Sequence, residues 1–90
     1  MKKKILVVDD EKSICLLLEN FLSQDYDVIA ISNGNDALLW LEGNLPDLII
    51  SDIQMPDIHG YAFLAKVRQR GFTKHTPFIM LSARDFNNIY

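Results

Sequence analysis

The chain has 90 residues, which is enough for one domain and too few for two. Hydrophobic residues make up 49% of it and charged residues 23%, which are ordinary globular proportions and argue against an intrinsically disordered tail. The net charge of −3 argues against nucleic acid as the main ligand, because domains that bind a polyphosphate backbone are usually basic. No apolar run reaches the roughly 18 residues of a membrane span. The single cysteine, Cys15, fits a reducing compartment, so we expect a cytoplasmic protein.

Four short apolar runs recur along the chain, at residues 5–8, 28–31, 48–50 and 78–81. None of them alternates with polar residues, and β-branched side chains are frequent in them. Such runs are typical of strands that are buried on both faces of a parallel sheet.

Helical spacing occupies the three segments between these runs, at residues 14–22, 37–41 and 61–68. The first segment carries one apolar stripe that we expect to pack on the sheet: Ile14, Leu17, Leu18, Phe21 and Leu22. The alternation of strands and helices predicts a parallel α/β sheet with right-handed crossovers. A closed α/β barrel needs about 250 residues, so an open doubly wound sheet is the remaining choice. We expect it to have the flavodoxin-like strand order 2-1-3-4.

Polar residues stand at the ends of three predicted strands. Asp9 and Asp10 come directly after the first apolar run, Asp52 closes the third strand and Ser82 closes the fourth. In a parallel sheet these strand ends lie on one rim, and in this strand order the first, third and fourth strands are neighbours. We therefore expect the three carboxylates and the hydroxyl to line one crevice, at the position where such folds bind ligands.

Three carboxylates in one crevice repel one another unless protons or a cation neutralise them. The candidate ligands are all oxygen atoms, which favours a hard ion such as Mg²⁺ over zinc. Because Mg²⁺ on one or two carboxylates keeps open positions for phosphate oxygens, the residues indicate phosphoryl chemistry with one Asp as nucleophile. Structural roles stay open for two of them: Asp10 as the N-cap of the first helix and Asp52 as the cap of the following loop.

Three segments resemble the receiver domain of bacterial response regulators. They are Ile-Leu-Val-Val-Asp-Asp-Glu at 5–11, Pro-Asp-Leu-Ile-Ile-Ser-Asp-Ile-Gln-Met-Pro-Asp-Ile-His-Gly at 46–60 and Thr-Pro-Phe-Ile-Met-Leu-Ser-Ala at 76–83. The resemblance runs from Lys3 to about Asp85, so residues 1–90 would form one receiver domain of a two-component phosphorelay. It implies a signalling module rather than an enzyme with turnover.

The resemblance also implies a role for each residue of the predicted site. Asp52 would accept a phosphoryl group from a sensor histidine kinase or a phosphotransfer protein. Asp10 and Asp52 would bind Mg²⁺ directly, and Asp9 would act through water. The backbone carbonyl of Gln54 would be the third protein ligand of the ion. Ser82 would be the switch hydroxyl that hydrogen-bonds to the phosphoryl group.

In this family a fourth helix, a fifth strand and a lysine that pairs with the phosphoryl group follow the switch hydroxyl. No lysine follows Lys74 in this sequence. The resemblance thus implies a domain that is incomplete at its C-terminus, with a sheet truncated before the fifth strand. The fourth strand would then be an exposed apolar edge, which predicts self-association through residues 78–81.

Two other functions stay open. A truncated or degenerate receiver would act as a protein-interaction module without phosphorylation, since the phosphorylated state would lack the charge-assisted hydrogen bond of the lysine. A phosphatase of the haloacid dehalogenase type also uses an Asp nucleophile with Mg²⁺. That family needs a second Asp two positions after the nucleophile, where Glu11 and Lys12 stand here, so we regard it as the weaker alternative.

Overall fold

The strands and helices follow the predicted alternation. The computed structural model describes residues 2–81 together with the strand at 88–89. Its elements, in chain order, are β1 (Lys4–Val8), α1 (Lys12–Leu22), β2 (Asp27–Ile31), α2 (Gly34–Leu41), β3 (Leu48–Asp52), α3 (Gly60–Gln69), β4 (Phe78–Leu81) and β5 (Asn88–Ile89). Each apolar run forms a strand, and each segment of helical spacing forms a helix. Of the helices in the described part of the chain, none is both long and apolar enough to cross a bilayer.

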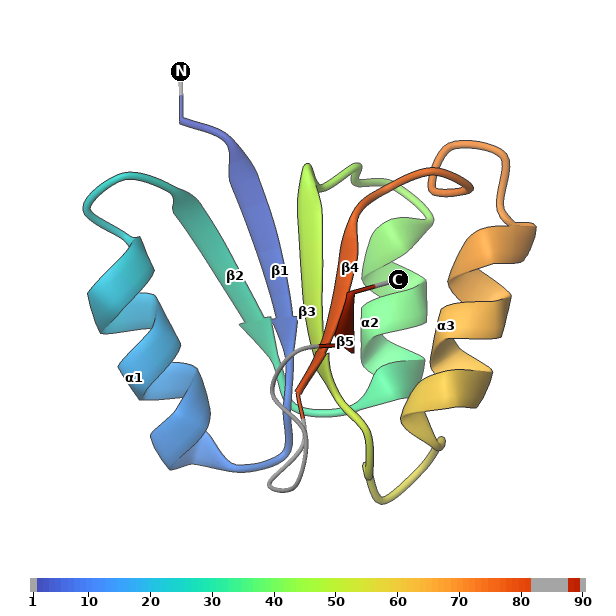
Figure 1. Cartoon of the computed structure of the whole chain (residues 1–90), viewed down its shortest axis with the longest axis horizontal. Helices are drawn as coiled ribbons and strands as arrows, with labels where there is room; N and C mark the ends of the chain where they lie inside the picture. Colours follow the sequence, from blue (N-terminus) through green and yellow to red (C-terminus); the bar gives the residue numbers. More distant parts are fainter. Residues whose placement is uncertain (1, 82–87, 90) are drawn as a thin grey trace.

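The sheet has the strand order β2-β1-β3-β4-β5, and its first four strands are parallel. Helix α1 packs on one face of the sheet, while α2 and α3 pack on the other (Figure 1). The predicted doubly wound sheet with strand order 2-1-3-4 is therefore confirmed.

Strand β1 supplies side chains to two separate cores, because successive residues of a strand point to opposite faces. Leu6 and Val8 pack with residues of α2 and α3. Ile5 and Val7 pack beneath α1. All four side chains are buried. This burial on both faces explains why the strand is a continuous apolar run rather than an alternating one.

Helix α1 turns a different side to the sheet from the predicted stripe. Leu18 and Leu22 do pack on the sheet, in company with Cys15. Leu17, however, is 63% exposed and Phe21 is 76% exposed, so the expectation that both are buried is wrong. Three consecutive leucines widen the apolar surface of this helix beyond one stripe. Contact with β1 and β2 then decides which part of that surface is buried.

The outer edge of β4 is partly covered. Strand β5 pairs with β4 in the antiparallel sense, with Ile79 opposite Ile89 and Met80 opposite Asn88. The expectation that the sheet stops at β4 with an open edge is therefore wrong, although the parallel part of the sheet does end there. An apolar edge strand presents unpaired N–H and C=O groups, and a short partner strand from the same chain satisfies some of them.

Candidate functional site

Three carboxylates meet at the carboxyl-terminal end of the sheet. Asp9 and Asp10 follow β1, and Asp52 is the last residue of β3. One oxygen atom from each of the three side chains lies within 4.8 Å of the others. The acidic residues that the sequence placed on one rim are thus brought together in space.

The register of the two central strands produces this convergence. Strands β1 and β3 are neighbours with Val8 opposite Ser51, so Asp9 and Asp52 follow the same rung of the ladder. The backbone N–H of Asp9 donates to the carbonyl of Ile31 at 3.1 Å, which ties the residue to β2 as well. The strand order reverses at this point, since β2 lies on one side of β1 and β3 on the other. Ligands of doubly wound sheets bind at such a reversal.

Asp9 is the most enclosed of the three residues, at 5% exposed, whereas Asp52 is half-buried and Asp10 is exposed. Its Oδ1 accepts a hydrogen bond from the backbone N–H of Glu11 at 2.9 Å. Burial raises the pKa of Asp9. The hydrogen bond from Glu11 lowers this pKa and the charges of Asp52 and Asp10 raise it, so that the net shift is upward. A cation in the crevice would favour the ionised form of this carboxylate.

Asp10 does not cap the first helix. Helix α1 begins at Lys12, and its N-cap residue is Glu11, whose side chain makes no capping hydrogen bond. The structural role considered for Asp10 is therefore wrong. Its exposed carboxylate is one of the three groups in the acidic cluster.

The donor set of the cluster fits Mg²⁺. Within the described part of the chain it consists of oxygen atoms from Asp9, Asp10 and Asp52. Mg²⁺ takes oxygen ligands at about 2.1 Å and usually keeps several waters. Carboxylates at this spacing can therefore share one ion, some by direct contact and others through water.

Gln54 lies in the loop that leaves β3, two residues beyond Asp52. This loop closes on itself, because Gln54 forms a β-bridge with His59 and the N–H of Gly60 donates to the carbonyl of Ile53. The backbone of Gln54 is thereby kept close to the end of β3, and its role as a metal ligand stays a prediction. Ser82, the predicted switch hydroxyl, lies outside the described residues.

The thiol of Cys15 lies beside the acidic cluster. It is half-buried, and its Sγ donates to the backbone carbonyl of Asp9 at 3.3 Å. Burial raises the pKa of Cys15, and the charge of Asp9 adds to the rise. A thiol with a raised pKa is a poor nucleophile, and the hydrogen bond from Cys15 joins helix α1 to the end of β1.

A fourth carboxylate, in the loop that follows β3, was not singled out from the sequence. Asp57 accepts hydrogen bonds from the backbone N–H groups of Gly34 at 3.1 Å and Asn35 at 2.7 Å. These partners lie 23 and 22 residues away along the chain, so no local pattern indicates the contact.

Replacing Asp9 with Asn is expected to raise the free energy of unfolding by about 1 kcal/mol in Mg²⁺-free buffer. Two unit charges about 5 Å apart repel each other by roughly 1 kcal/mol in water and roughly 3 kcal/mol at an effective dielectric constant of 20. The amide oxygen of Asn still accepts the hydrogen bond from Glu11. Urea denaturation measures the change, with Asp27→Asn, an exposed acid at the far end of β2, as the control. Equal or lower stability of Asp9→Asn would contradict repulsion within the cluster.

Comparison with known proteins points to one family. A family model of the response regulator receiver domain matches residues 5–89. The alkaline phosphatase synthesis transcriptional regulatory protein PhoP of Bacillus subtilis is 44% identical over 86 residues, which cover 94% of this chain and 35% of that protein. The phosphate regulon transcriptional regulatory protein PhoB of Rhizobium meliloti is 39% identical over 85 residues, which cover 93% of this chain and 37% of that protein. The chain thus spans about a third of the length of these relatives.

The fold is shared with solved structures. The chemotaxis response regulator CheY4 of Vibrio cholerae matches with a TM-score of 0.86 at 34% sequence identity. The match covers 89% of this chain and 68% of that chain.

Proposed function

The chain belongs to the response regulator receiver domain family, and we propose that it accepts a phosphoryl group on Asp52 with the help of Mg²⁺. The observation that carries the proposal is the convergence of Asp9, Asp10 and Asp52 within 4.8 Å at the carboxyl end of the sheet. Phosphoryl transfer needs a positioned nucleophile and neutralised charge, and little covalent help beyond that. Asp52 supplies the nucleophile, and the cluster supplies the place for the cation.

Asp52 is well placed for nucleophilic attack. Asp52 pairs with Leu81 of β4, and the residue before it, Ser51, pairs with Val8 of β1, so the end of β3 is held on both sides. One of its carboxylate oxygens attacks the phosphorus of an acyl phosphate or a phosphohistidine. The new O–P bond forms as the bond to the donor's oxygen or nitrogen breaks, and the leaving group departs with that electron pair.

Asp10 and Asp52 would hold Mg²⁺ directly, and the backbone carbonyl of Gln54 would be the third protein ligand. When bound, the ion neutralises charge on the carboxylates and on the phosphoryl oxygens. Asp9 would act through a water molecule. The hydrogen bond from Glu11 orients the Asp9 carboxylate for that role.

The phosphoryl donor that we propose is a sensor histidine kinase or a phosphotransfer protein, and the proposed location is the cytoplasm. Receiver domains are generally non-enzymatic signalling modules. The output of this chain would therefore pass through contact with another protein or with a further part of the same protein.

Self-association through β4 stays a prediction. Strand β5 already pairs with Ile79 and Met80, which leaves a second copy of the chain less free edge than the sequence indicated.

Native mass spectrometry before and after incubation with acetyl phosphate and Mg²⁺ tests the proposed function. We expect the mass of one phosphoryl group to be gained with Mg²⁺ and not in the presence of a chelator. The same spectra report whether the chain is a monomer or a dimer. A folded chain that gains no phosphoryl group would overturn the proposal and favour a receiver that acts only as an interaction module. Rapid, sustained release of inorganic phosphate would instead favour the phosphatase alternative.

A further inference from the structure

The loop between β3 and α3, residues 53–59, is joined to the first turn of α2 by one side chain. Asp57 is exposed at the surface, yet its two carboxylate oxygens accept from two successive backbone N–H groups. Oδ1 accepts from Gly34 at 3.1 Å, and Oδ2 accepts from Asn35 at 2.7 Å. The contact joins two parts of the chain that are far apart in sequence.

These two hydrogen bonds satisfy the free backbone N–H groups at the start of α2. The first N–H groups of a helix have no partner within the helix. In α2 the N-cap residue Asn33 accepts from the N–H of Asp36 at 2.8 Å, which leaves the N–H groups of Gly34 and Asn35 to be satisfied from elsewhere. Asp57 satisfies both, and its negative charge also suits the positive end of the helix dipole.

The ionisation of Asp57 agrees with this geometry. Burial raises the pKa of Asp57, while hydrogen bonds from the backbone N–H groups of Asn35, Gly34, Asp57 itself and Ile58 lower it, and the net shift of the pKa is downward. The side chain is therefore a carboxylate at neutral pH and can accept from both N–H groups.

Packing brings the loop and the helix together at the same place. Ile58 and Met55 pack with the core on this side of the sheet. Gly34 is buried, and a Cβ at this position would overlap Cγ2 of Ile58. The loop can approach α2 this closely because residue 34 has no side chain.

The other end of the same loop lies beside the acidic cluster. The bridge between Gln54 and His59 and the hydrogen bond from Gly60 to Ile53 close the loop into a small unit. A unit that is closed at its base moves largely as one body. Holding Asp57 at its tip therefore restricts Gln54 at its base.

We propose that Asp57 is a positioning residue. By accepting hydrogen bonds from the first turn of α2, it holds the backbone of Gln54 in place beside Asp52. This inference rests on the proposed function, because it assigns the held carbonyl of Gln54 to the Mg²⁺ site. It makes α2 a structural support of that site, although α2 supplies no ligand to the acidic cluster.

Mg²⁺ binding by Asp57→Ala and Asp57→Asn tests the inference, with titrations followed by ¹H–¹⁵N NMR. Loss of an outer partner of a metal ligand typically weakens metal binding by 10–100-fold, so we expect a dissociation constant about tenfold higher for Asp57→Ala. The Asn side chain keeps one oxygen acceptor but sets an NH2 group against the second N–H, so we expect the dissociation constant of Asp57→Asn to lie between those of the wild type and Asp57→Ala. Phosphoryl uptake by Asp57→Ala should be slow at low Mg²⁺ and recover at saturating Mg²⁺, because the nucleophile is intact.

Asp36→Ala is the matched control. Asp36 is an exposed acid on the same turn of α2, but its carboxylate accepts from the side chain of Asn33 rather than reaching the loop. We expect its Mg²⁺ affinity to equal that of the wild type. Equal weakening by Asp57→Ala, Asp57→Asn and Asp36→Ala would show that only the negative charge matters, which would overturn the inference.

Hydrogen exchange of the Gly60 amide gives a second test that does not depend on Mg²⁺. This N–H closes the loop onto Ile53, so it should exchange about tenfold faster in Asp57→Ala, while the amide of Ile49 in β3 stays protected. Unchanged exchange at Gly60 would overturn the inference. A wild-type chain that binds no Mg²⁺ and takes up no phosphoryl group would overturn the proposed function, and the exchange result would still decide whether Asp57 holds the loop.

Discussion

The Asp52→Asn variant is expected to take up no phosphoryl group from acetyl phosphate and Mg²⁺, while remaining folded. An amide oxygen is a far weaker nucleophile than a carboxylate oxygen, and the change also removes one charged ligand of the proposed Mg²⁺ site. Asn has nearly the same shape as Asp, and residue 52 is half-buried outside the hydrophobic core. Removing one of three like charges relieves repulsion in the cluster, so stability should stay the same or rise.

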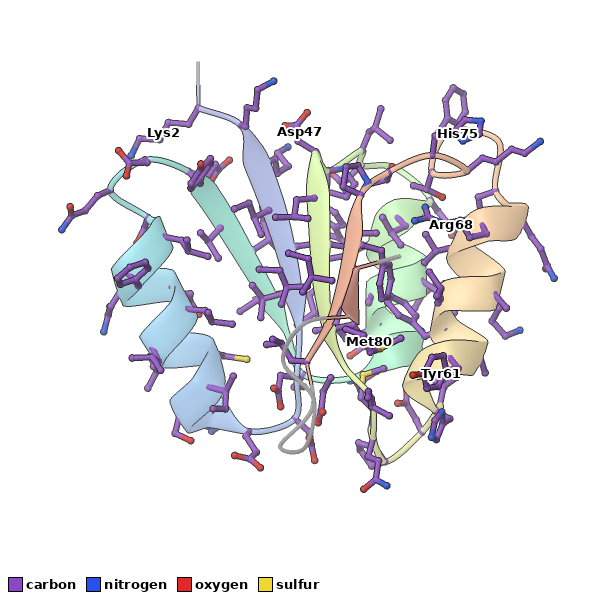
Figure 2. All side chains as sticks on the ribbon, in the orientation of Figure 1. Lys2, Asp47, Tyr61, Arg68, His75 and Met80 are labelled. Carbon is purple, nitrogen blue, oxygen red and sulfur yellow. The ribbon has the colours of Figure 1, made fainter. Side chains whose placement is uncertain are left out.

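Asp47→Asn is the matched control for this experiment. Asp47 precedes β3 and lies at the opposite end of that strand from Asp52 (Figure 2). Its Oδ2 accepts from the backbone N–H of Lys4 at 2.8 Å, a hydrogen bond that an amide oxygen can also accept. We expect wild-type phosphoryl uptake by mass spectrometry and wild-type stability in urea. Phosphoryl uptake that persists in Asp52→Asn would place the acceptor on another residue, with Asp10 the next to substitute.

The Gly60→Ala variant is expected to lose about 3 kcal/mol of stability and to take up phosphoryl groups far more slowly. A Cβ on residue 60 would lie 2.6 Å from the backbone oxygen of Asp52 and 2.7 Å from Cα of Ile53. Overpacking of a buried position costs about 1–3 kcal/mol, and the upper end applies because backbone atoms cannot rotate away as a side chain does. Relief requires the end of β3, which carries Asp52, and the start of α3 to move apart. A displacement of about 1 Å at a reacting group can slow a reaction about 100-fold.

Gly43→Ala and Gly71→Ala are the controls for Gly60→Ala. A Cβ at either position meets no atom within 4 Å, and no described glycine has a positive φ. Alanine at such positions typically adds about 0.4–1 kcal/mol of stability by restricting the unfolded chain. Urea denaturation and the rate of phosphoryl uptake distinguish the three variants. A Gly60→Ala protein as stable as Gly43→Ala would show that the end of β3 moves aside at little cost, contrary to our expectation.

The strands were predictable because their environment leaves a local mark on the sequence. A strand buried on both faces must be apolar at every position, as Leu6 and Val7 of β1 show. The acidic rim was predictable for a related reason. In a parallel sheet, the residues at the carboxyl ends of all strands lie at the same edge. Asp9 and Asp52 do so, because the residues before them, Val8 and Ser51, are paired in neighbouring strands.

The inner side of α1 and the edge of β4 were not predictable in the same way. The apolar surface of α1 is broader than the sheet can cover, so spacing alone does not show that Leu18 is inside and Leu17 outside. Strand β5 pairs with β4 in the antiparallel sense, and no pattern of apolar residues in the sequence indicates that pairing. Both features are decided by which surfaces are left to be covered after the parallel sheet has formed.

By itself the sequence determined the α/β alternation and the placement of three carboxylates at the carboxyl-terminal end of the strands. Each of these follows from the chemistry of residues that are neighbours in the chain, combined with the geometry of a parallel sheet. Only the tertiary structure decided how the site is supported. The contact of Asp57 with Gly34 and the close approach of Gly60 to the backbone of Asp52 join separate segments. Such contacts exist only after the chain has folded. They could not be predicted, because a contact with a backbone N–H group or the need for a missing Cβ leaves no periodic pattern in the sequence.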